Sequence, residues 1–145
     1  MIKSDRIEAW SGLLRITRAL HDAIEADLKE AGYPPPGWYD ALFELTRADP
    51  HGLRQVDLRD RLALAQYTVS RLLDRMEAAG LIVRVTSPTD KRSQIIRPTD
   101  AGLELLDAMW PVYRDAIAQR FGARLSDTDT ARLNDLIDRF DAAKD

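Results

Sequence analysis

The chain has 145 residues, of which 45% are hydrophobic and 31% charged, and this composition is typical of one soluble globular domain. No apolar run approaches the roughly 20 residues of a membrane-spanning helix, and the first residues lack the apolar stretch of a signal peptide. We therefore expect a cytoplasmic protein with no membrane contact. The absence of cysteine excludes disulfides, thiolate metal ligands and the sensing of oxidants through a thiol.

Charge is divided unevenly along the chain, whose net charge is −3. Residues 53–98 contain nine Lys or Arg and five Asp or Glu, a balance of +4, whereas the rest of the chain contains 12 basic and 19 acidic residues, a balance of −7. A basic central region suits contact with phosphates, and the acidic remainder would discourage indiscriminate binding to nucleic acid.

The first third of the chain predicts two helices. Residues 5–31 carry apolar side chains at helical spacing, and Gly32 is expected to end this helix. Residues 34–37, three prolines and a glycine, are expected to prevent helix through the next turn, so the second helix is predicted over 38–48. A loop is expected over 49–52.

The centre of the chain predicts a helix, a turn and a second helix. The first, short helix is expected over 54–62, and a turn of three residues separates it from the second helix, over 66–79. In the second helix Val69, Leu72, Leu73 and Met76 recur at the spacing of one helical face. Gly80 can adopt the left-handed conformation that often follows the end of a helix.

Two strands around a polar tip are predicted next, over 81–86 and 93–97, because the segment 87–92 between them is polar and contains a proline. A helix-turn-helix followed by a β-hairpin predicts a winged helix-turn-helix, which is a mainly α fold with a small β-hairpin wing. Two long helices complete the chain. Thr99 is expected to cap a helix over 100–121 that bends at Pro111, and Ser126 is expected to cap a helix that runs to about residue 143.

The face of the 66–79 helix opposite its apolar stripe carries amide, hydroxyl and guanidinium groups, which hydrogen-bond base edges and phosphates. The residues that we expect to contact DNA from this helix are Gln66, Tyr67, Thr68, Ser70, Arg71 and Arg75. The first four lie near the N-terminus of the helix and should face bases, whereas Arg75 better suits a phosphate. Asp74 is expected to orient a neighbouring arginine, because a carboxylate repels phosphate.

Two segments of the chain resemble the MarR family of bacterial transcription regulators. Residues 68–84 are similar to that family's recognition helix and first wing strand. Asp90-Lys91-Arg92, followed by residues 97–102, is similar to its wing signature, an Asp-x-Arg tip and a Leu-Thr-x-x-Gly-like entry to the next helix. The outer helices match only in length and periodicity. Three positions depart from the pattern: Ala65 offers no side-chain cap to the recognition helix, Tyr67 is bulkier than usual, and Pro98 replaces leucine.

The resemblance implies one domain over 1–145, with dimerisation helices at about 1–33 and 103–145 and a winged helix-turn-helix DNA-binding region at about 34–102. The terminal helices carry more apolar surface than the small central core can cover. They either close a monomeric core or, as the resemblance implies, interlock with a second copy. A two-fold homodimer would place its recognition helices about 34 Å apart on a pseudo-palindromic double-stranded operator.

The wing is expected to contact DNA through its tip. Asp90 can accept hydrogen bonds from turn amides or from an arginine and hold the tip in shape, so that Lys91 and Arg92 project outward. Arg92 is the candidate for insertion into the minor groove, where the negative potential is enhanced.

Aromatic and apolar residues of the first, second and fifth predicted helices are either core residues or the lining of a ligand pocket. In the resembled family these helices border a cleft between the dimerising helices and the winged region, where several relatives bind small aromatic or phenolic effectors. Arg15 or Arg18 could supply charge to a carboxylate there. The candidate pocket residues are Trp10, Leu14, Trp38, Tyr39, Phe43, Met109 and Tyr113.

The sequence contains no catalytic motif, no phosphate-binding glycine loop and no zinc-ligand spacing, so we expect no enzyme, cofactor or metal site. His21 and His51 stand apart and are expected to be structural. The function that these features predict is a homodimeric transcription regulator, most simply a repressor that a small effector releases from DNA. Two alternatives are a structural DNA-binding protein without an effector and a winged-helix module that binds protein through the polar helix face.

Overall fold

The computed structural model describes residues 1, 3–48, 51–62 and 64–141. It is mainly helical with a small β wing, which confirms the predicted fold class. The elements in chain order are α1 (Ser4–Glu30), α2 (Pro36–Thr46), β1 (Leu53–Arg54), α3 (Gln55–Leu62), α4 (Gln66–Ala78), β2 (Ile82–Thr86), β3 (Gln94–Pro98), α5 (Asp100–Arg120), a 3-10 turn (Gly122–Arg124) and α6 (Asp127–Asp141).

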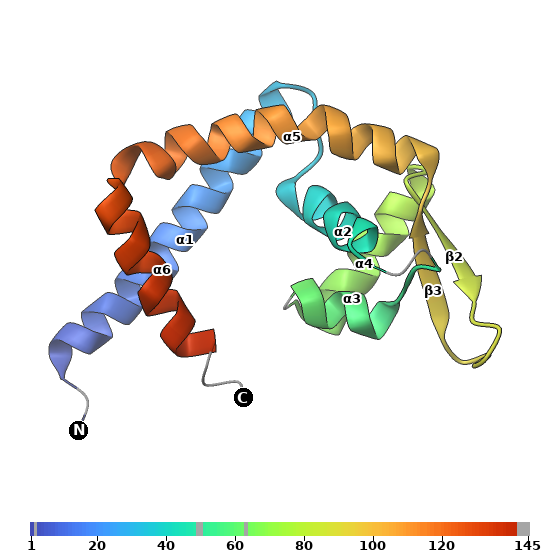
Figure 1. The fold of residues 1–145 in the computed structure, drawn as a ribbon, viewed down its shortest axis with the longest axis horizontal. Helices are drawn as coiled ribbons and strands as arrows, with labels where there is room; N and C mark the ends of the chain where they lie inside the picture. The colour runs from blue at the N-terminus through green and yellow to red at the C-terminus, as the bar shows by residue number, and fades with distance from the viewer. Residues whose placement is uncertain (2, 49–50, 63, 142–145) are drawn as a thin grey trace.

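The molecule has the form of an arch (Figure 1). Helix α5 crosses the top, the winged lobe of α2, α3, α4 and the sheet lies under one end, and α1 and α6 descend together at the other end. The start of α1 and the end of α6 both lie at the foot of this α1–α6 leg. The winged lobe and the terminal helices therefore form two bodies joined by α5 and the upper part of α1.

The core of the winged lobe is built on the apolar stripe of α4. Val69, Leu73 and Met76 are fully buried, and Leu72 packs against them at the edge. They meet buried leucines of α2 and α3 and one isoleucine from each of β2 and β3. Each fully buried side chain of this size contributes about 1.5–3 kcal/mol relative to exposure. The stripe predicted from the sequence thus fixes which face of α4 remains outside.

The sheet has three antiparallel strands in the order β1-β3-β2, where the sequence predicted only two. Leu53 pairs with Ile96, so the chain forms two residues of strand before α3 begins at Gln55, one residue later than predicted. Gly52 permits this approach: its φ is +99°, and a Cβ there would lie 2.5 Å from the carbonyl oxygen of Ile96. The sequence did not predict β1, because two residues are too few to show the alternation of apolar and polar side chains that identifies a strand.

Helix α2 begins at Pro36 and not at 38, so the prediction that the proline run excludes helix up to 37 was wrong. Proline is tolerated in the first helical turn because its missing N–H would have no intrahelical acceptor there. Parts of two predicted connections, residues 49, 50 and 63, lie outside the described residues, as does the end of the last predicted helix beyond residue 141.

The junction between α4, β2 and α5 is held by Thr99. Its backbone N–H donates to the Leu81 carbonyl at 3.0 Å, its hydroxyl donates to the Gly80 carbonyl at 2.6 Å, and the same hydroxyl accepts from the Gly102 amide at 3.1 Å. Gly80 has the left-handed φ of +77° that was predicted for the end of α4. One side chain thus caps α5 and ties it to the end of the recognition helix.

The long C-terminal helices follow the predictions closely. Helix α5 continues through Pro111 without interruption and follows a shallow arch in Figure 1. Ser126 and Asp129 cap the start of α6 reciprocally, each side chain accepting the other's backbone amide at 3.1 Å. Arg120 near the end of α5 forms a two-point ion pair with Asp27 of α1, at 2.7 and 2.9 Å. None of the described helices combines the length and apolar character that crossing a bilayer requires.

Candidate nucleic-acid interface

The outer face of α4 is polar and open to solvent. Gln66, Thr68, Arg71 and Arg75 are exposed, and Ser70 is half-buried beside the wing side of the helix. Ala65 precedes the helix without a side-chain hydrogen bond to it, as the sequence predicted. The first-turn amides therefore have no competing side-chain acceptor and remain available to an anionic partner.

Tyr67 and Arg71 form a pair on this face. The Arg71 guanidinium donates to the Tyr67 hydroxyl at 2.9 Å and lies 5.5 Å from the centre of its ring. Tyr67 is 69% exposed, so the pair stands out from the helix surface rather than filling the core. The cation–π contact and the hydrogen bond together hold the Arg71 side chain against Tyr67, one turn earlier on α4.

Arg84 of β2 joins the recognition helix to the wing. Its guanidinium donates to Asp74 at 2.6 Å and lies 3.8 Å from Glu77, both on the outer side of α4. Only 13% of the Arg84 side chain is exposed, and its Nε is buried without a hydrogen-bond partner. The expectation that Asp74 orients an arginine is confirmed. The pair fixes the angle at which helix and wing meet.

The tip of the wing is shaped by Asp90, as predicted. One carboxylate oxygen accepts from the Arg92 amide at 3.0 Å, and the other accepts from the Ser93 hydroxyl at 3.1 Å. Lys91 and Arg92 are exposed on either side of this turn. The Asp90 side chain is thus occupied by hydrogen bonds within the tip, and the cationic side chains of Lys91 and Arg92 are exposed on it.

A hollow of about 310 Å³ separates the wing from the helix-turn-helix. It is lined from α4 by Gln66, from the wing by Arg92 and Gln94, from β1 by Arg54 and from α3 by Arg59. Arg54 pairs with Asp57 at 2.9 Å, and Arg59 reaches the Gln66 amide oxygen at 3.5 Å. The sequence counted Arg54 and Arg59 as part of the basic region but did not place them beside the recognition helix, because that proximity depends on how α3 packs.

A second, larger cleft of about 600 Å³ lies between α1, α2 and α4. Side chains of α4 form one wall of it, so some of the residues expected to face DNA also border this cleft. The lining residues are His21, Glu25, Pro35, Gly37, Trp38, Asp40, Leu62, Leu64, Tyr67, Thr68, Arg71, Leu72 and Arg75. Of the seven residues that the sequence suggested for an effector pocket, only Trp38 belongs to this lining.

The other six suggested pocket residues lie elsewhere. Trp10 and Leu14 are exposed on the first half of α1, more than 10 Å along the helix from His21 at about 1.5 Å per residue. Met109 is fully buried. Arg15 and Arg18 are exposed on α1 and are not part of the cleft lining. Helical spacing could not show this separation. It shows that α1 has one apolar face, but not which part of that face lies beside the cleft.

Tyr39, Phe43 and Tyr113 form an aromatic cluster with Trp110 between α2 and α5. Tyr39 stacks on Phe43 and Trp110 with ring centres 6.0 and 5.4 Å apart, and meets Tyr113 edge to face at 5.2 Å. Such pairs contribute about 0.5–1.5 kcal/mol each beyond the burial of their surface. This cluster joins the winged lobe to the arch.

Asp40 connects the aromatic cluster with the cleft. Its carboxylate accepts a hydrogen bond from the Tyr113 hydroxyl at 3.3 Å, and burial raises the pKa of Asp40. Burial also raises the pKa of Tyr113 to about 12, and the neighbouring Asp40 adds to this rise. Asp40 thus lies at one side of the cleft, and the arginines of α4 lie at the other. A ligand or an ion bound between them would change the local balance of charge.

A winged helix-turn-helix with a polar recognition helix, a basic wing tip and a basic hollow between them defines a DNA-binding transcription regulator. The family model described as the MarR family matches residues 31–93. The uncharacterized HTH-type transcriptional regulator YkoM of Bacillus subtilis (strain 168) is 37% identical over 123 residues, which make up 81% of this chain and 77% of YkoM.

Two solved structures from Streptomyces coelicolor share the fold. The MarR family regulator Sco3205, in complex with DNA, has a TM-score of 0.87 at 23% identity and covers 100% of this chain and 94% of its own. The PcaV transcriptional regulator, in complex with its natural ligand, has a TM-score of 0.78 at 26% identity and covers 92% of this chain and 91% of its own. The chain belongs to the MarR family, whose members are DNA-binding transcription regulators and not enzymes.

Proposed function

We propose that the protein is a homodimeric repressor that binds a pseudo-palindromic operator and is released from it by a small ligand. The observation that carries the proposal is the rigid placement of a polar recognition helix beside a cationic wing tip, with Arg84 fixing the two against each other. A helix in the major groove and a wing tip reaching the adjacent minor groove read one half-site together.

The side chains divide by the DNA groups that they would meet. Gln66, Thr68 and Ser70 lie near the N-terminus of α4 and would contact base edges, with Tyr67 beside them for a thymine methyl group. Arg71 and Arg75 would contact a base or the backbone. On the other side, Lys91 and Arg92 of the tip held by Asp90, together with Arg54 and Arg59 around the hollow, would contact phosphates.

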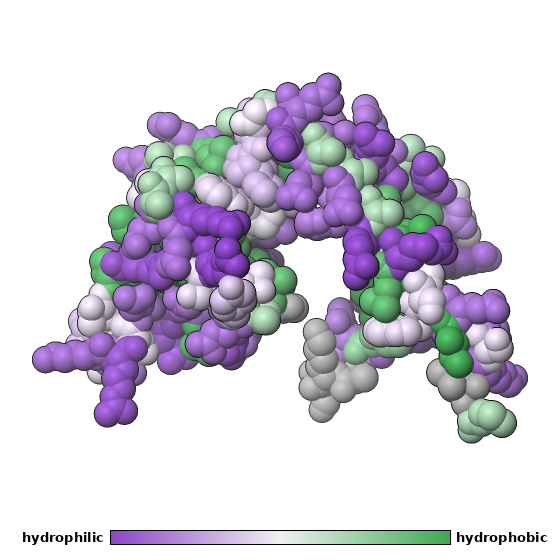
Figure 2. Space-filling model, turned by 180° about the vertical axis from the view of Figure 1, so that it is seen from behind, coloured by the Kyte–Doolittle hydropathy of each residue, from purple (hydrophilic) through white to green (hydrophobic). Residues whose placement is uncertain are grey.

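The terminal helices support a dimer. Ile7, Trp10 and Leu13 of α1 are between 48% and 62% exposed, and Leu136, Ile137 and Phe140 of α6 are between 46% and 75% exposed. Figure 2 shows apolar residues on the surface of the α1–α6 leg. Exposed apolar residues gathered on one part of a molecule mark a protein interface, and a second copy of the same leg offers a matching surface. The alternative of a closed monomeric core is disfavoured because these helices leave their apolar faces open.

The cleft between α1, α2 and α4 supports regulation by a small ligand. Trp38 and Tyr67 offer aromatic surface, and Arg71 and Arg75 offer positive charge, which together suit a small aromatic acid or phenol. A ligand held there would contact the recognition helix directly. The cleft disfavours the alternative of a structural DNA-binding protein without an effector. The basic wing disfavours the alternative of a module that binds protein.

The test is selection of bound fragments from genomic DNA, followed by sedimentation of the protein alone and with a selected duplex. We expect a dimer at micromolar concentration and an inverted repeat with half-sites about one helical turn apart. A monomer with no preference for any selected duplex over random DNA would overturn the proposal.

A further inference from the structure

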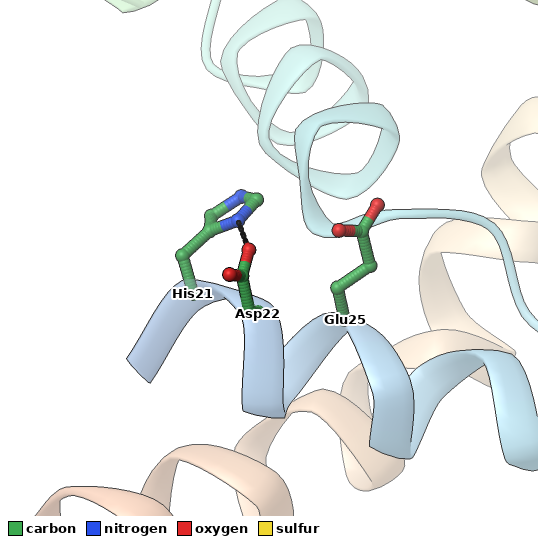
Figure 3. A group of neighbouring side chains, drawn as sticks. All are labelled: His21, Asp22 and Glu25. Carbon is green, nitrogen blue, oxygen red and sulfur yellow. Dashed lines mark ion pairs between the residues drawn. The ribbon is translucent and has the colours of Figure 1, made fainter. Parts of the chain in front are cut away.

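Three potential metal ligands lie together on one turn of α1. His21, Asp22 and Glu25 each offer one nitrogen or oxygen atom, and these atoms all lie within 4.8 Å of one another. Figure 3 shows the three side chains on the side of α1 that faces the start of α2. His21 and Glu25 are four residues apart and so occupy the same face of the helix.

We propose that His21, Asp22 and Glu25 bind a divalent transition-metal ion of the zinc type at the edge of the cleft. An imidazole nitrogen and two carboxylate oxygens are ligands that such ions accept together, and neither a thiol nor a preformed loop is needed. Bonds of about 2.0–2.2 Å place ligand atoms roughly 3–3.5 Å apart, so the group must contract by a little over 1 Å. The His21 and Asp22 side chains are 57% and 70% exposed and can rotate to do so.

The site faces the winged lobe across the cleft. Asp40 of α2 belongs to the same cleft lining as His21 and Glu25 of α1. An ion that Asp40 also contacted would connect α1, which belongs to the α1–α6 leg, with α2, which belongs to the winged lobe.

The position of the site gives it a role in regulation. The cleft that His21 and Glu25 border is walled on its other side by Tyr67, Arg71 and Arg75 of the recognition helix. A divalent charge that ties α1 to α2 would alter both the geometry of this cleft and the electrostatic surroundings of the two arginines. We therefore expect the affinity for DNA to depend on the metal. This consequence rests on the proposed DNA-binding function, whereas metal binding itself does not.

Metal binding is tested on tag-free protein by titrating Zn²⁺ against a colorimetric chelator, and by following the visible absorption of Co²⁺. We expect one ion per chain in the wild type and at least a tenfold loss of affinity in His21→Ala and in Glu25→Gln. Two matched controls should bind as the wild type does: His51→Gln, which removes the chain's other imidazole, and Glu30→Gln, which removes an exposed carboxylate from the same helix. The circular dichroism of each variant confirms that it is folded.

Two results would overturn the site. One is wild-type binding that His21→Ala does not weaken; the other is binding by the wild type that is no tighter than that of the Glu25→Gln variant. Either would mean that His21 and Asp22, 4.0 Å apart, form only a surface ion pair.

The regulatory consequence is tested with a selected operator by fluorescence anisotropy, with Zn²⁺ or with a chelator present. We expect the wild-type affinity to change at least fivefold between the two conditions and the His21→Ala affinity to remain constant. Equal changes in both proteins would overturn the coupling. Metal binding by a protein that binds no DNA at all would support the site and overturn the proposed function instead.

Discussion

Gly102 has a packing role that the wing signature of the sequence conceals. A Cβ at this position would overlap the carbonyl oxygen of Leu81, which is backbone and cannot swing aside, and would press on Leu42 as well. We predict that Gly102→Ala destabilises the fold by about 1–3 kcal/mol, because the end of α4 and the start of α5 must separate. Urea denaturation measures the change.

The matched control for this prediction is Gly37→Ala in the first turn of α2. A Cβ there meets no atom within 4 Å, so the substitution should be neutral or stabilising by up to about 1 kcal/mol. If both variants unfold at the same denaturant concentration, the approach of Gly102 to Leu81 does not limit stability.

Tyr113 predicts how stability changes in alkaline solution. Burial raises its pKa to about 12, whereas an unfolded tyrosine titrates near its ordinary value of about 10. Between these values the unfolded chain loses the proton and the folded chain retains it, so the free energy of unfolding falls as the pH rises. Because Tyr113 is half exposed, solvent screening limits the loss to about 1 kcal/mol.

Thermal unfolding at pH 9 and at pH 11.5 checks this expectation. The loss of stability between the two should be smaller in Tyr113→Phe than in the wild type. Tyr67→Phe serves as the control, because Tyr67 is exposed and should keep the wild-type dependence. An identical pH dependence in all three proteins would contradict the prediction.

At the scale of single residues, the sequence predicted those roles that depend on near neighbours. Asp90 acts on residues two and three positions away, and Thr99 caps its own helix, so local spacing was sufficient. Arg54 and Arg59 line a hollow beside α4 only because of the way α3 packs, and His21 and Asp40 line one cleft only because α1 lies beside α2. The spacing of residues along the sequence cannot predict proximity that depends on how the helices pack.

The link between the recognition helix and the wing predicts an effect on DNA affinity that is separate from charge. Arg84 is mostly buried against Asp74 and Glu77, so we place it as a positioning residue rather than a phosphate contact. Arg84→Met should weaken operator binding at least tenfold, because the helix and the wing no longer meet their grooves together. The dependence of affinity on salt should be unchanged, since no phosphate contact is removed.

Asp74→Asn distinguishes this role from a lost DNA contact. It removes the carboxylate that holds Arg84, and it also removes a negative charge that would repel phosphate. A direct electrostatic effect would therefore strengthen binding, whereas a positioning effect would weaken it. Fluorescence anisotropy at several salt concentrations measures both quantities. A reduced salt dependence in Arg84→Met would show that Arg84 touches the DNA backbone.

Reading and anchoring can be separated between α4 and the wing. Ser70→Ala or Gln66→Ala should cost about 1–3 kcal/mol on the selected site and relax preference at one base pair per half-site. Arg92→Ala should weaken binding evenly across sequences and reduce the salt dependence. The comparison requires titration of each variant on the selected duplex and on random DNA. Unchanged affinity and salt dependence in Arg92→Ala would mean that the wing does not touch DNA.

Element by element, the long helices were predictable and the short connections were not. Helical periodicity located α1, α4, α5 and α6 to within a few residues, because each carries an apolar face over several turns. The two residues of β1 pair with a strand more than 40 positions away, and α2 starts on a proline that a local rule excluded. These features depend on tertiary contacts and on the special tolerance of a first helical turn.

At the scale of the whole molecule, the structure forms a cleft that includes only one of the residues suggested by the sequence for a ligand site. The sequence grouped aromatic residues by the helices that carry them, whereas the cleft draws its walls from α1, α2 and the recognition helix and keeps only Trp38 of that group. The α1–α6 leg and the winged lobe meet at this cleft. Any ligand in it therefore lies between the two bodies of the arch.

A ligand in the cleft can change DNA affinity only if it binds unequally to two arrangements of these bodies. Contact with Arg71 and Arg75 would supply that inequality, because the same guanidinium groups cannot serve both a carboxylate in the cleft and the DNA. A coupling of about 1–3 kcal/mol would lower operator affinity roughly 5- to 150-fold. Linkage requires that bound operator weaken the ligand by the same factor.

We therefore predict that a small aromatic acid or phenol quenches tryptophan fluorescence and releases DNA over the same range of concentration. Titrating the members of an aromatic library with and without operator measures the coupling in both directions. Trp38→Phe should reduce the affinity for ligand and most of the quenching, because Trp38 lines the cleft. Trp10→Phe is the matched control, since Trp10 lies outside that lining and is 62% exposed on α1. Ligands that respond to Trp10→Phe but ignore both Trp38→Phe and the operator would place the effector site on the dimerising leg instead.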